Sequence, residues 1–232
     1  MRPQNINSLK CVPIGQRIHV MGNSCAGKST LGAQLADALN IPFVELDALN
    51  WEPGWVGLNE TNPEALERRL SLATQGDGWV VAGSYTKFSQ RIFWPRLQTV
   101  VWLDLPVHQL LVRVLIRSWR RWRTKELLWG TNYERFWPQL MVWNKEDSLV
   151  WWIVTQRKRK RLGMLEFMSD PRWKHIRFVR IGSMDELKAF SRTMNLPSMK
   201  SILAKVSKQR EPNQKDPVGQ SQRGPFTDLY RV

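Results

Sequence analysis

The stretch Gly22-Asn23-Ser24-Cys25-Ala26-Gly27-Lys28-Ser29-Thr30 matches the phosphate-loop pattern G-x-x-x-x-G-K-[ST]. Residues 17–21 before it predict a short buried strand, and leucines at helical spacing after it predict a helix. Glycines let the backbone turn tightly with its N–H groups directed at an anion, and the following helix adds the positive end of its dipole. The alternative is a glycine-rich turn that binds no ligand.

Within this pattern two side chains have defined tasks. Lys28 is expected to reach the β- and γ-phosphates of a nucleotide, and the Ser29 hydroxyl is expected to help hold Mg²⁺. All nine residues from Gly22 to Thr30 are therefore predicted to form the nucleotide site.

Length and composition indicate the size and class of the protein that carries this loop. The chain has 232 residues, 42% of them hydrophobic, which suffices for one sizeable α/β domain and an accessory segment. It has no uninterrupted apolar run of about 18 residues and no apolar signal core near its start, so we expect a cytoplasmic protein. Cys11 and Cys25 are too few for a disulfide scaffold.

The formal charge of +15 predicts an affinity for polyanions or multiply charged small anions. One concentration of basic residues lies in 196–232, where Pro, Gln, Ser and Gly predict a disordered tail. The others lie at 113–125 and 157–161, inside the part of the chain that is predicted to fold.

Strands and helices alternate along the chain. Further strands are predicted at 42–47, 78–83, 99–104 and 176–181, and helices at 63–73, from 107 to about 117, at 148–168 and at 184–194. Continuous apolar strands alternating with helices indicate an α/β fold with a parallel sheet covered on both faces. Ligands bind outside the carboxyl ends of such strands, where Gly22, Asp47, Gly83 and Asp104 fall.

Several spaced segments support a family resemblance. Beside the phosphate loop these are 46–51 followed by Pro53-Gly54-Trp55, 79–85, 101–106, and the Trp-rich stretch before Arg159. With them the chain resembles adenylate-kinase-like P-loop kinases from about 17 to 194, and within these the DNA topology modulation proteins. The resemblance implies a P-loop NTPase fold with a five-stranded parallel sheet of order 2-3-1-4-5 and a mobile helical lid. The expected organisation is a leader at 1–16, a kinase-like domain at 17–195 with its lid at about 118–161, and the tail at 196–232.

The resemblance also implies roles for arginines. In adenylate kinases two arginines four residues apart follow an Asp-x-Pro and contact ATP, and Asp104-Leu105-Pro106 is followed here by Arg113 and Arg117 at the same offsets. On a helix these two would share a face with Arg121, where like charges repel until phosphates neutralise them. The alternative is a solvated basic face.

Lid cations of the family are matched by a second group of arginines. Arg159 and Arg161 fit the family's basic positions best, and on a helix Arg157 would share a face with Arg161 while Arg159 points elsewhere. Such cations neutralise charge on a transferring phosphoryl group.

Two acids are candidates for the remaining chemistry. Asp47 is placed by the resemblance where such kinases orient or deprotonate the acceptor hydroxyl; capping a helix or ordering Mg²⁺ are its alternatives. Asp104 is a candidate for Mg²⁺ binding through water, or for fixing the turn into the next helix.

The chain departs from the family at two places. Ala82-Gly83-Ser84-Tyr85 stands where the family commonly has Asp-Gly-Asn-Tyr, so an acid beside the phosphate loop is missing and metal contact falls to Asp47, Asp104 or water. The Gly-Phe-Pro-Arg that grips a nucleoside monophosphate is also absent, with Lys87 and Arg91 the nearest cations. AMP is therefore not the expected acceptor.

Tryptophans interleaved with arginines leave a second function open. Such a mixture either packs a helical lid or stacks bases along a nucleic acid; its tryptophans are Trp119, Trp122, Trp129, Trp137, Trp143, Trp151 and Trp152. The three histidines show no metal-ligand spacing and receive no role.

The leading hypothesis is a phosphotransferase that uses ATP and Mg²⁺ on an unidentified small acceptor. Its catalytic residues would be Lys28, Asp47, Arg113, Arg117 and Arg159, with Ser29 and Asp104 at the metal. The alternative is a nucleotide-binding protein that holds nucleic acid weakly and non-specifically through its lid and basic tail. Neither hypothesis includes a membrane partner.

Overall fold

The computed structural model describes residues 13–125, 127–129, 132–133 and 149–197, without the side chains of 149–154 and 156. All of them belong to one compact unit, which ends at Pro197. The predicted tail from 198 onward, most of the predicted leader and much of the predicted lid lie outside the described residues, as do Cys11, Trp137 and Trp143. The proposed domain boundaries stay predictions.

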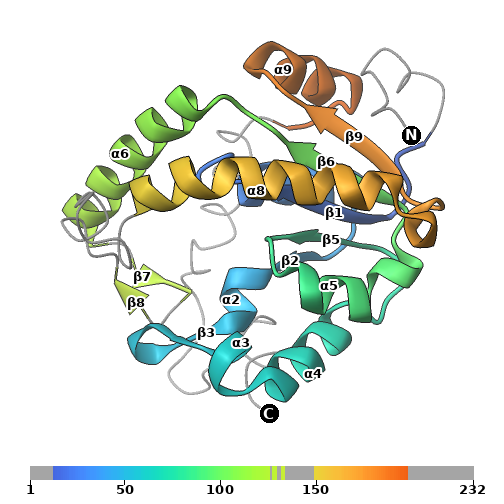
Figure 1. Ribbon diagram of the computed structural model, residues 1–232, viewed down its shortest axis with the longest axis horizontal. Coiled ribbons are helices and arrows are strands. Elements are labelled where there is room, and N and C mark those ends of the chain that lie inside the picture. Colours follow the sequence, from blue (N-terminus) through green and yellow to red (C-terminus); the bar gives the residue numbers. More distant parts are fainter. Residues whose placement is uncertain (1–12, 126, 130–131, 134–148, 198–232) are drawn as a thin grey trace, which may run out of the picture. The chain divides into compact units, whose positions relative to one another are not determined.

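Five parallel strands form the central sheet (Figure 1). Their order is β2 (Phe43–Glu45), β5 (Trp79–Ala82), β1 (Arg17–Gly22), β6 (Thr99–Leu103) and β9 (Arg177–Ile181). Numbered along the chain within this sheet, they follow the predicted order 2-3-1-4-5. The central position of β1 places the end of this strand, and the phosphate loop after it, between the ends of β5 and β6.

Helices cover both faces of the sheet, as the sequence predicts. One face packs against α1 (Lys28–Leu39), α6 (Val107–Thr124) and α9 (Met184–Thr193). The other face packs against α2 (Leu46–Asn50), α3 (Leu58–Thr61), α4 (Pro63–Ala73), α5 (Thr86–Ile92) and α8 (Leu149–Ser169), and in Figure 1 α8 crosses in front of β1 and β6. Three short 3₁₀ helices complete the helical elements of the described residues: η2 (Pro53–Trp55), η3 (Trp94–Arg96) and η4 (Pro171–Trp173).

Strand side chains alternate between the two apolar layers. In β5, Val80 lies in the layer with α1 while Val81 lies in the layer with α4, and in β6 Val101 and Trp102 divide in the same way. Because both faces of a parallel sheet are covered, each strand reads as a continuous apolar run. The unbroken runs that predicted these strands therefore have a direct physical cause.

Some boundaries differ from the prediction. The second strand ends at Glu45, and Asp47 lies in the first turn of α2, not at the end of a strand. The sixth helix continues to Thr124, beyond the predicted end near Arg117, and Lys125 ends it in the left-handed conformation (φ 47°). Its buried residues Leu110, Val114 and Ser118 keep helical spacing through this extension, so the start of the predicted lid continues α6.

Two short hairpins that are distant in sequence pack against each other through aromatic side chains and hydrogen bonds. The hairpin β7 (Leu127–Leu128) and β8 (Asn132–Tyr133) meets the hairpin β3 (Trp51–Glu52) and β4 (Val56–Gly57). Buried Asn132 accepts a hydrogen bond from the Trp55 amide (2.9 Å) and donates one to the Glu52 carbonyl (2.9 Å). The Trp129 ring packs edge-on against Trp55 at 5.9 Å. The chain after α6 is thereby fixed to the chain after α2.

A fully buried histidine supports the centre of the sheet. His19 of β1 accepts a hydrogen bond from Trp94 Nε1 at Nδ1 (3.1 Å), so its Nε2–H donates to the Gly83 carbonyl (3.2 Å). Burial lowers the pKa of His19 to about 3, with the Gly83 hydrogen bond opposing and Lys28 adding to the shift. His19 therefore has a structural role, although no role was predicted for any of the three histidines.

We expect the stability of this protein to fall at acidic pH because of His19. Below pH 6.5 the unfolded chain binds a proton at this residue and the folded chain does not until about pH 3, so the free energy of unfolding decreases as pH falls through this window. At pH 4.5 the loss from this group is about 3 kcal/mol. Urea unfolding at pH 7.5 and 4.5 measures it in the wild type and in His19→Gln.

The His19→Gln variant is expected to show a shallower pH dependence, whatever its absolute stability. The matched control is His108→Gln, at an exposed position in α6. An identical pH slope in His19→Gln and the wild type would contradict the assignment.

Candidate active site at the phosphate loop

The loop between β1 and α1 has the geometry that its glycines predict. Gly22 has φ +152°, and a Cβ there would lie 2.7 Å from the Leu103 carbonyl oxygen, so no side chain fits. Gly27 has φ +95° and forms the N-cap of α1. Cys25 also occupies the left-handed region (φ 60°). Strand, loop and helix therefore follow one another as the pattern requires, with the α1 amides at the loop.

Lys28 lies over this loop. Its Nζ donates a hydrogen bond to the Asn23 carbonyl (3.0 Å), while the Asn23 side chain accepts one from the Ser24 amide (2.9 Å). Burial lowers the pKa of Lys28, Arg117 adds to the shift, and Asp47, Cys25 and Glu45 oppose it. An anion at the loop would stabilise the charged form of this lysine.

The Ser29 hydroxyl meets a carboxylate that the sequence reasoning missed. Its Oγ donates a hydrogen bond to Glu45 Oε1 at 2.6 Å. Glu45 is the last residue of β2 and precedes Asp47 by two, so a pair of acids at one strand end was the available signal. Two oxygens of the kind that Mg²⁺ prefers thus lie together beside the loop.

Ala82 stands where the family resemblance would place an acid. Ala82 is buried on the face that packs against α1, and its Cβ is 3.3 Å from where a Gly32 Cβ would be. A carboxylate here would be pressed against α1. Glu45 pairs in register with Ala82 across β2 and β5, so the neighbouring strand supplies a carboxylate at the same level of the sheet.

Asp47, in the first turn of α2, is an acid that acts on both Lys28 and Tyr85. It stabilises the charged form of Lys28 and interacts with the Tyr85 side chain. Burial first, and then the Asp47 carboxylate, raise the pKa of Tyr85, so this phenol stays protonated. Gly83 permits this arrangement, because a Cβ there would lie 2.5 Å from Leu46 Cβ.

Two of the predicted arginines reach the loop from α6. Arg113 donates to the Ala26 carbonyl (3.1 Å) and contacts Met184 Sδ (2.9 Å). Arg117 lies near enough to lower the pKa of Lys28, and within the described residues its buried Nε has no hydrogen-bond partner. The helix predicted for both is confirmed, and it brings them to one side of the phosphate loop.

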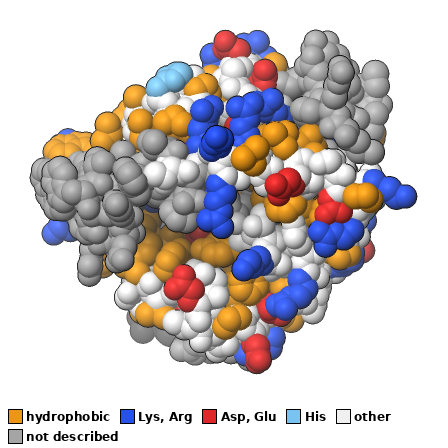
Figure 2. Space-filling view, viewed as in Figure 1, with side chains coloured by type: hydrophobic (Ala, Val, Ile, Leu, Met, Phe, Trp, Pro, Cys, Tyr) orange, Lys and Arg blue, Asp and Glu red, His pale blue; other side chains and the backbone are white. Residues whose placement is uncertain are grey.

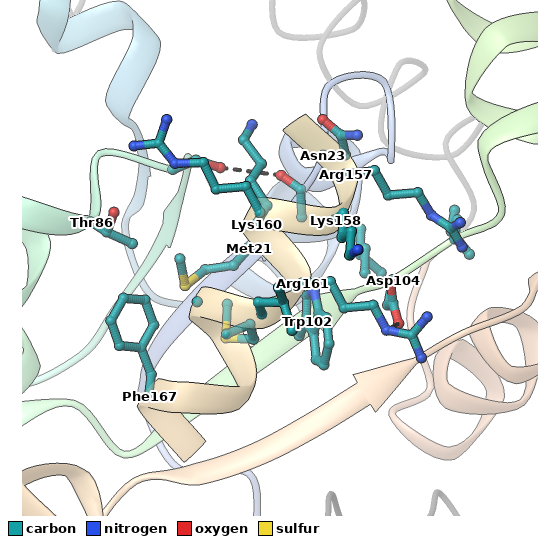
Figure 3. A pocket seen from close by; sticks show the side chains of 18 of the residues that line it. Met21, Asn23, Thr86, Trp102, Asp104, Arg157, Lys158, Lys160, Arg161 and Phe167 are labelled. Carbon is teal, nitrogen blue, oxygen red and sulfur yellow. Dashed lines mark hydrogen bonds and ion pairs between the residues drawn. The ribbon is translucent and has the colours of Figure 1, made fainter. Parts of the chain in front are cut away.

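A pocket of about 790 Å³ separates the phosphate loop and the ends of β1 and β6 from α8 (Figure 3). Met21, Trp102 and Phe167 are among its apolar lining residues, and all of 157–161 line its basic side. Figure 3 shows Lys160 extending toward the side of the pocket where Asn23 lies. Arg159 also lines the pocket, but its side chain is exposed, whereas Lys160 is partly buried.

Asp104 is held by two arginines at the edge of this pocket. Its Oδ2 accepts a hydrogen bond from Arg180 Nε (2.9 Å) and lies 3.5 Å from Arg161 Nε, and its side chain is 6% exposed. This geometry favours the structural alternative for Asp104 over the metal site. Its predicted part in Mg²⁺ binding stays untested.

Other predicted features are placed less centrally. Trp119 and Trp122 are half-exposed on α6, and their ring centroids are 5.3 Å apart. This arrangement is compatible with lid packing and with base stacking. The exposed Arg91 forms an ion pair with Glu67, and the Lys87 side chain is exposed.

The described residues contain no group of three or more His, Cys, Asp or Glu arranged to hold a metal ion. Within the same residues, no helix is long and apolar enough to span a membrane.

Comparisons with known proteins are limited in extent. No family model matches the chain. The uncharacterized protein YqaC of Bacillus subtilis (strain 168) is 30% identical over 123 residues, which cover 52% of this chain and 66% of that protein. The match thus spans less than two thirds of that relative's length.

Solved structures align with most of the chain at low similarity. Shikimate kinase from Bacteroides thetaiotaomicron has a TM-score of 0.45 and 19% identity, covering 82% of this chain and 98% of its own. A gluconokinase from Sinorhizobium meliloti 1021 has a TM-score of 0.41 and 20% identity, and the match covers 86% of this chain and 99% of that one. A deoxyadenosine kinase from M. mycoides has a TM-score of 0.39 and 11% identity, and the match covers 82% of this chain and 98% of that one. None of these names refers to the DNA topology modulation group, so that narrower resemblance stays a prediction. The activity of this chain has to be inferred from its own site.

Asp104→Asn separates the two roles of this acid. If Asp104 is structural, the variant leaves two arginines without their carboxylate and loses about 2 kcal/mol of stability in urea unfolding, since its partners are only partly buried. The Mg²⁺ dependence of nucleotide binding should stay unchanged. Asp185→Asn is the matched control, because it removes an exposed ion pair with Lys188 that contributes little. Unchanged stability with a raised Mg²⁺ requirement would assign Asp104 to the metal.

Proposed function

We propose that the protein is an ATP-dependent phosphotransferase that phosphorylates a hydroxyl group of a small molecule. The observation that carries this proposal is the convergence of Lys28, the Ser29–Glu45 pair and Asp47 around one phosphate loop. A cation, a metal-binding pair and a further carboxylate are the groups that phosphoryl transfer to a hydroxyl requires.

ATP would lie with its phosphates against the loop. The backbone amides at the N-terminus of α1 and Lys28 favour the β- and γ-phosphates. Arg117 is supported for the same task because its buried Nε has no hydrogen-bond partner in the described part of the chain. Arg113 donates a hydrogen bond to the Ala26 carbonyl, so it supports the loop backbone and adds positive charge beside it. Arg159 is retained as a lid cation.

Mg²⁺ fits the Ser29–Glu45 pair. This ion takes one or two protein oxygens and completes its shell with phosphate oxygens and water, so a larger cluster of acids is not needed. When bound, it would neutralise charge on the phosphates. Ser29 and Glu45 would hold it, with Glu45 replacing the acid that the family carries at the position of Ala82.

Asp47 would act on the acceptor. Its carboxylate accepts a hydrogen bond from the acceptor hydroxyl and takes up the proton as the oxygen bonds to the γ-phosphorus and the bond to ADP breaks. Tyr85, protonated and interacting with Asp47, fixes the orientation of the carboxylate. Positioning is the larger part of this task, because the transfer itself requires little covalent assistance.

Lys28→Ala tests the loop. The loop amides stay in place but the cation is lost, so we expect a fall of about 100-fold or more in phosphate transfer from γ-labelled ATP, with unchanged thermal unfolding. The screen uses nucleosides, nucleoside monophosphates, sugars and hydroxy acids as acceptors. The matched control is Lys87→Ala at an exposed position of α5. Wild-type turnover in Lys28→Ala would remove the basis of the proposal.

Two isosteric changes separate the acids. Asp47→Asn should lower kcat about 100-fold while ATP affinity changes little, because the carboxylate serves the acceptor. Glu45→Gln should instead raise the Mg²⁺ concentration at half-maximal rate. Asp37→Asn on the exposed side of α1 is the control for both. Equal losses of ATP affinity and kcat in Asp47→Asn would assign that residue to the metal or to the scaffold.

A further inference from the structure

Helix α6 carries two apolar stripes on opposite sides. Val114 and Ser118 lie in the inner stripe, which is fully buried against the sheet. On the other side Val112, Leu115 and Ile116 are 55%, 47% and 64% exposed. A surface helix normally buries one apolar stripe and turns a polar side to the solvent. We call the second stripe the outer face, and its residues are Val112, Leu115, Ile116, Trp119 and Trp122.

The outer face extends over several turns of the helix. Trp119 and Trp122 follow Leu115 at helical spacing and are 50% and 44% exposed, so large apolar side chains reach the surface from Val112 to Trp122. Figure 2 shows hydrophobic side chains gathered over α6, at the upper left of the view. Single exposed apolar residues are common on proteins, whereas a contiguous patch of them indicates a contact surface.

Positive charge adjoins the outer face. From Val107 to Thr124 the helix contains arginines and no Asp or Glu. Arg113 turns toward the phosphate loop, where it donates to the Ala26 carbonyl. Arg123 and Lys125 are instead exposed at the C-terminal end of α6, beside Trp122. A partner that matches this surface therefore has to offer an apolar layer and negative charge together.

Three classes of partner differ in this respect. Nucleic acid supplies phosphates, but its backbone presents no apolar layer to Val112, Leu115 and Ile116. A second copy of this chain in a two-fold contact would set the same acid-free helix against itself, so its arginines would gain no carboxylate there. An anionic bilayer supplies both, because its acyl boundary takes up aliphatic side chains, its interface favours tryptophan and its phosphates attract arginine.

We propose that the outer face of α6 docks this protein on the surface of an anionic phospholipid membrane. The helix would lie in the plane of the interface, with Leu115 and Ile116 at the acyl boundary and Arg123 at the headgroups. This is binding to a surface and involves no membrane-spanning segment. A membrane partner belongs to neither function hypothesis drawn from the sequence, and the docking does not depend on the proposed phosphoryl transfer.

Cosedimentation of the full-length protein with vesicles tests the apolar contact. Vesicles of phosphatidylcholine alone, or of phosphatidylcholine mixed equally with phosphatidylglycerol, are used at physiological salt. The wild type should bind the anionic vesicles, and Ile116→Asp should lower the partition coefficient tenfold or more. The matched control is Leu72→Asp, which adds the same charge at a leucine that is 55% exposed on α4, and it should bind like the wild type.

A milder variant covers the case in which Ile116→Asp loses its fold. Val112→Ser should lower binding at least threefold with unchanged thermal unfolding, since this side chain is mostly exposed. Arg123→Gln tests the charge and should weaken binding to anionic vesicles about fivefold. Its control is Arg68→Gln on α4, whose exposed side chain adjoins only Glu64 among the printed ion pairs of that helix turn.

Fluorescence quenching shows which part of the protein touches the lipid. Lipids brominated along their acyl chains should quench the tryptophan emission of the wild type, and quench it less in Trp119→Phe and Trp122→Phe. The basic segment 196–232 contains no tryptophan, so binding through this segment alone would leave the emission of the outer face unquenched.

Several results would overturn the inference. Equal binding of the wild type and Ile116→Asp to anionic vesicles would do so, as would no binding by the wild type or equal binding to neutral vesicles. Self-association that Ile116→Asp abolishes in sedimentation velocity, without vesicle binding, would assign the outer face to a second copy. Binding of single-stranded DNA that the same variant abolishes would assign it to nucleic acid. None of these measurements uses ATP, so their outcome is independent of the proposed function.

Discussion

Repulsion among cations is the constraint on which this site depends. Lys28 of α1, Arg117 of α6 and Lys160 of α8 influence one another in this way. Burial lowers the pKa of Lys28 and Arg117 adds to that shift, and burial followed by Lys28 lowers the pKa of Lys160. Such an arrangement is unfavourable in the absence of anions and is held by packing of the helices on both faces of the sheet. The fold therefore stabilises a charge arrangement that a polyphosphate would neutralise.

Carboxylates at the same edge are placed by strand register. Glu45 pairs in register with Ala82 of the adjacent strand, and its carboxylate accepts a hydrogen bond from the Ser29 hydroxyl. Ala82 itself packs closely against α1 at Gly32. Loss of one acid in a motif thus does not mean loss of the oxygen ligands around the site.

Hydrogen bonds between segments distant in sequence hold the backbone around the site. His19 joins β1 to Gly83 and Trp94, Arg180 holds Asp104, and Asn132 joins the chain after α6 to the chain after α2. None of these residues belongs to the phosphate-loop pattern. They fix the backbone that carries Asp47, Tyr85 and the loop, and the proposed phosphoryl transfer would require such precise positioning.

Local periodicity predicted the α/β class and the helix that carries Arg113 and Arg117, and a contiguous motif predicted the phosphate loop. The strand order followed from the family resemblance and agrees with the observed sheet. The partners of Ser29, Asp104 and His19 and the place of Lys160 in the pocket lining depend on residues distant in sequence, so they follow from the folded arrangement and not from any local pattern. Glu45 and Lys160 stand beside the residues that the motifs indicated, Asp47 and Arg159. That Glu45 lies at the site together with Asp47 depends on where β2 ends, and the place of Lys160 depends on how α8 packs. Local spacing encodes neither.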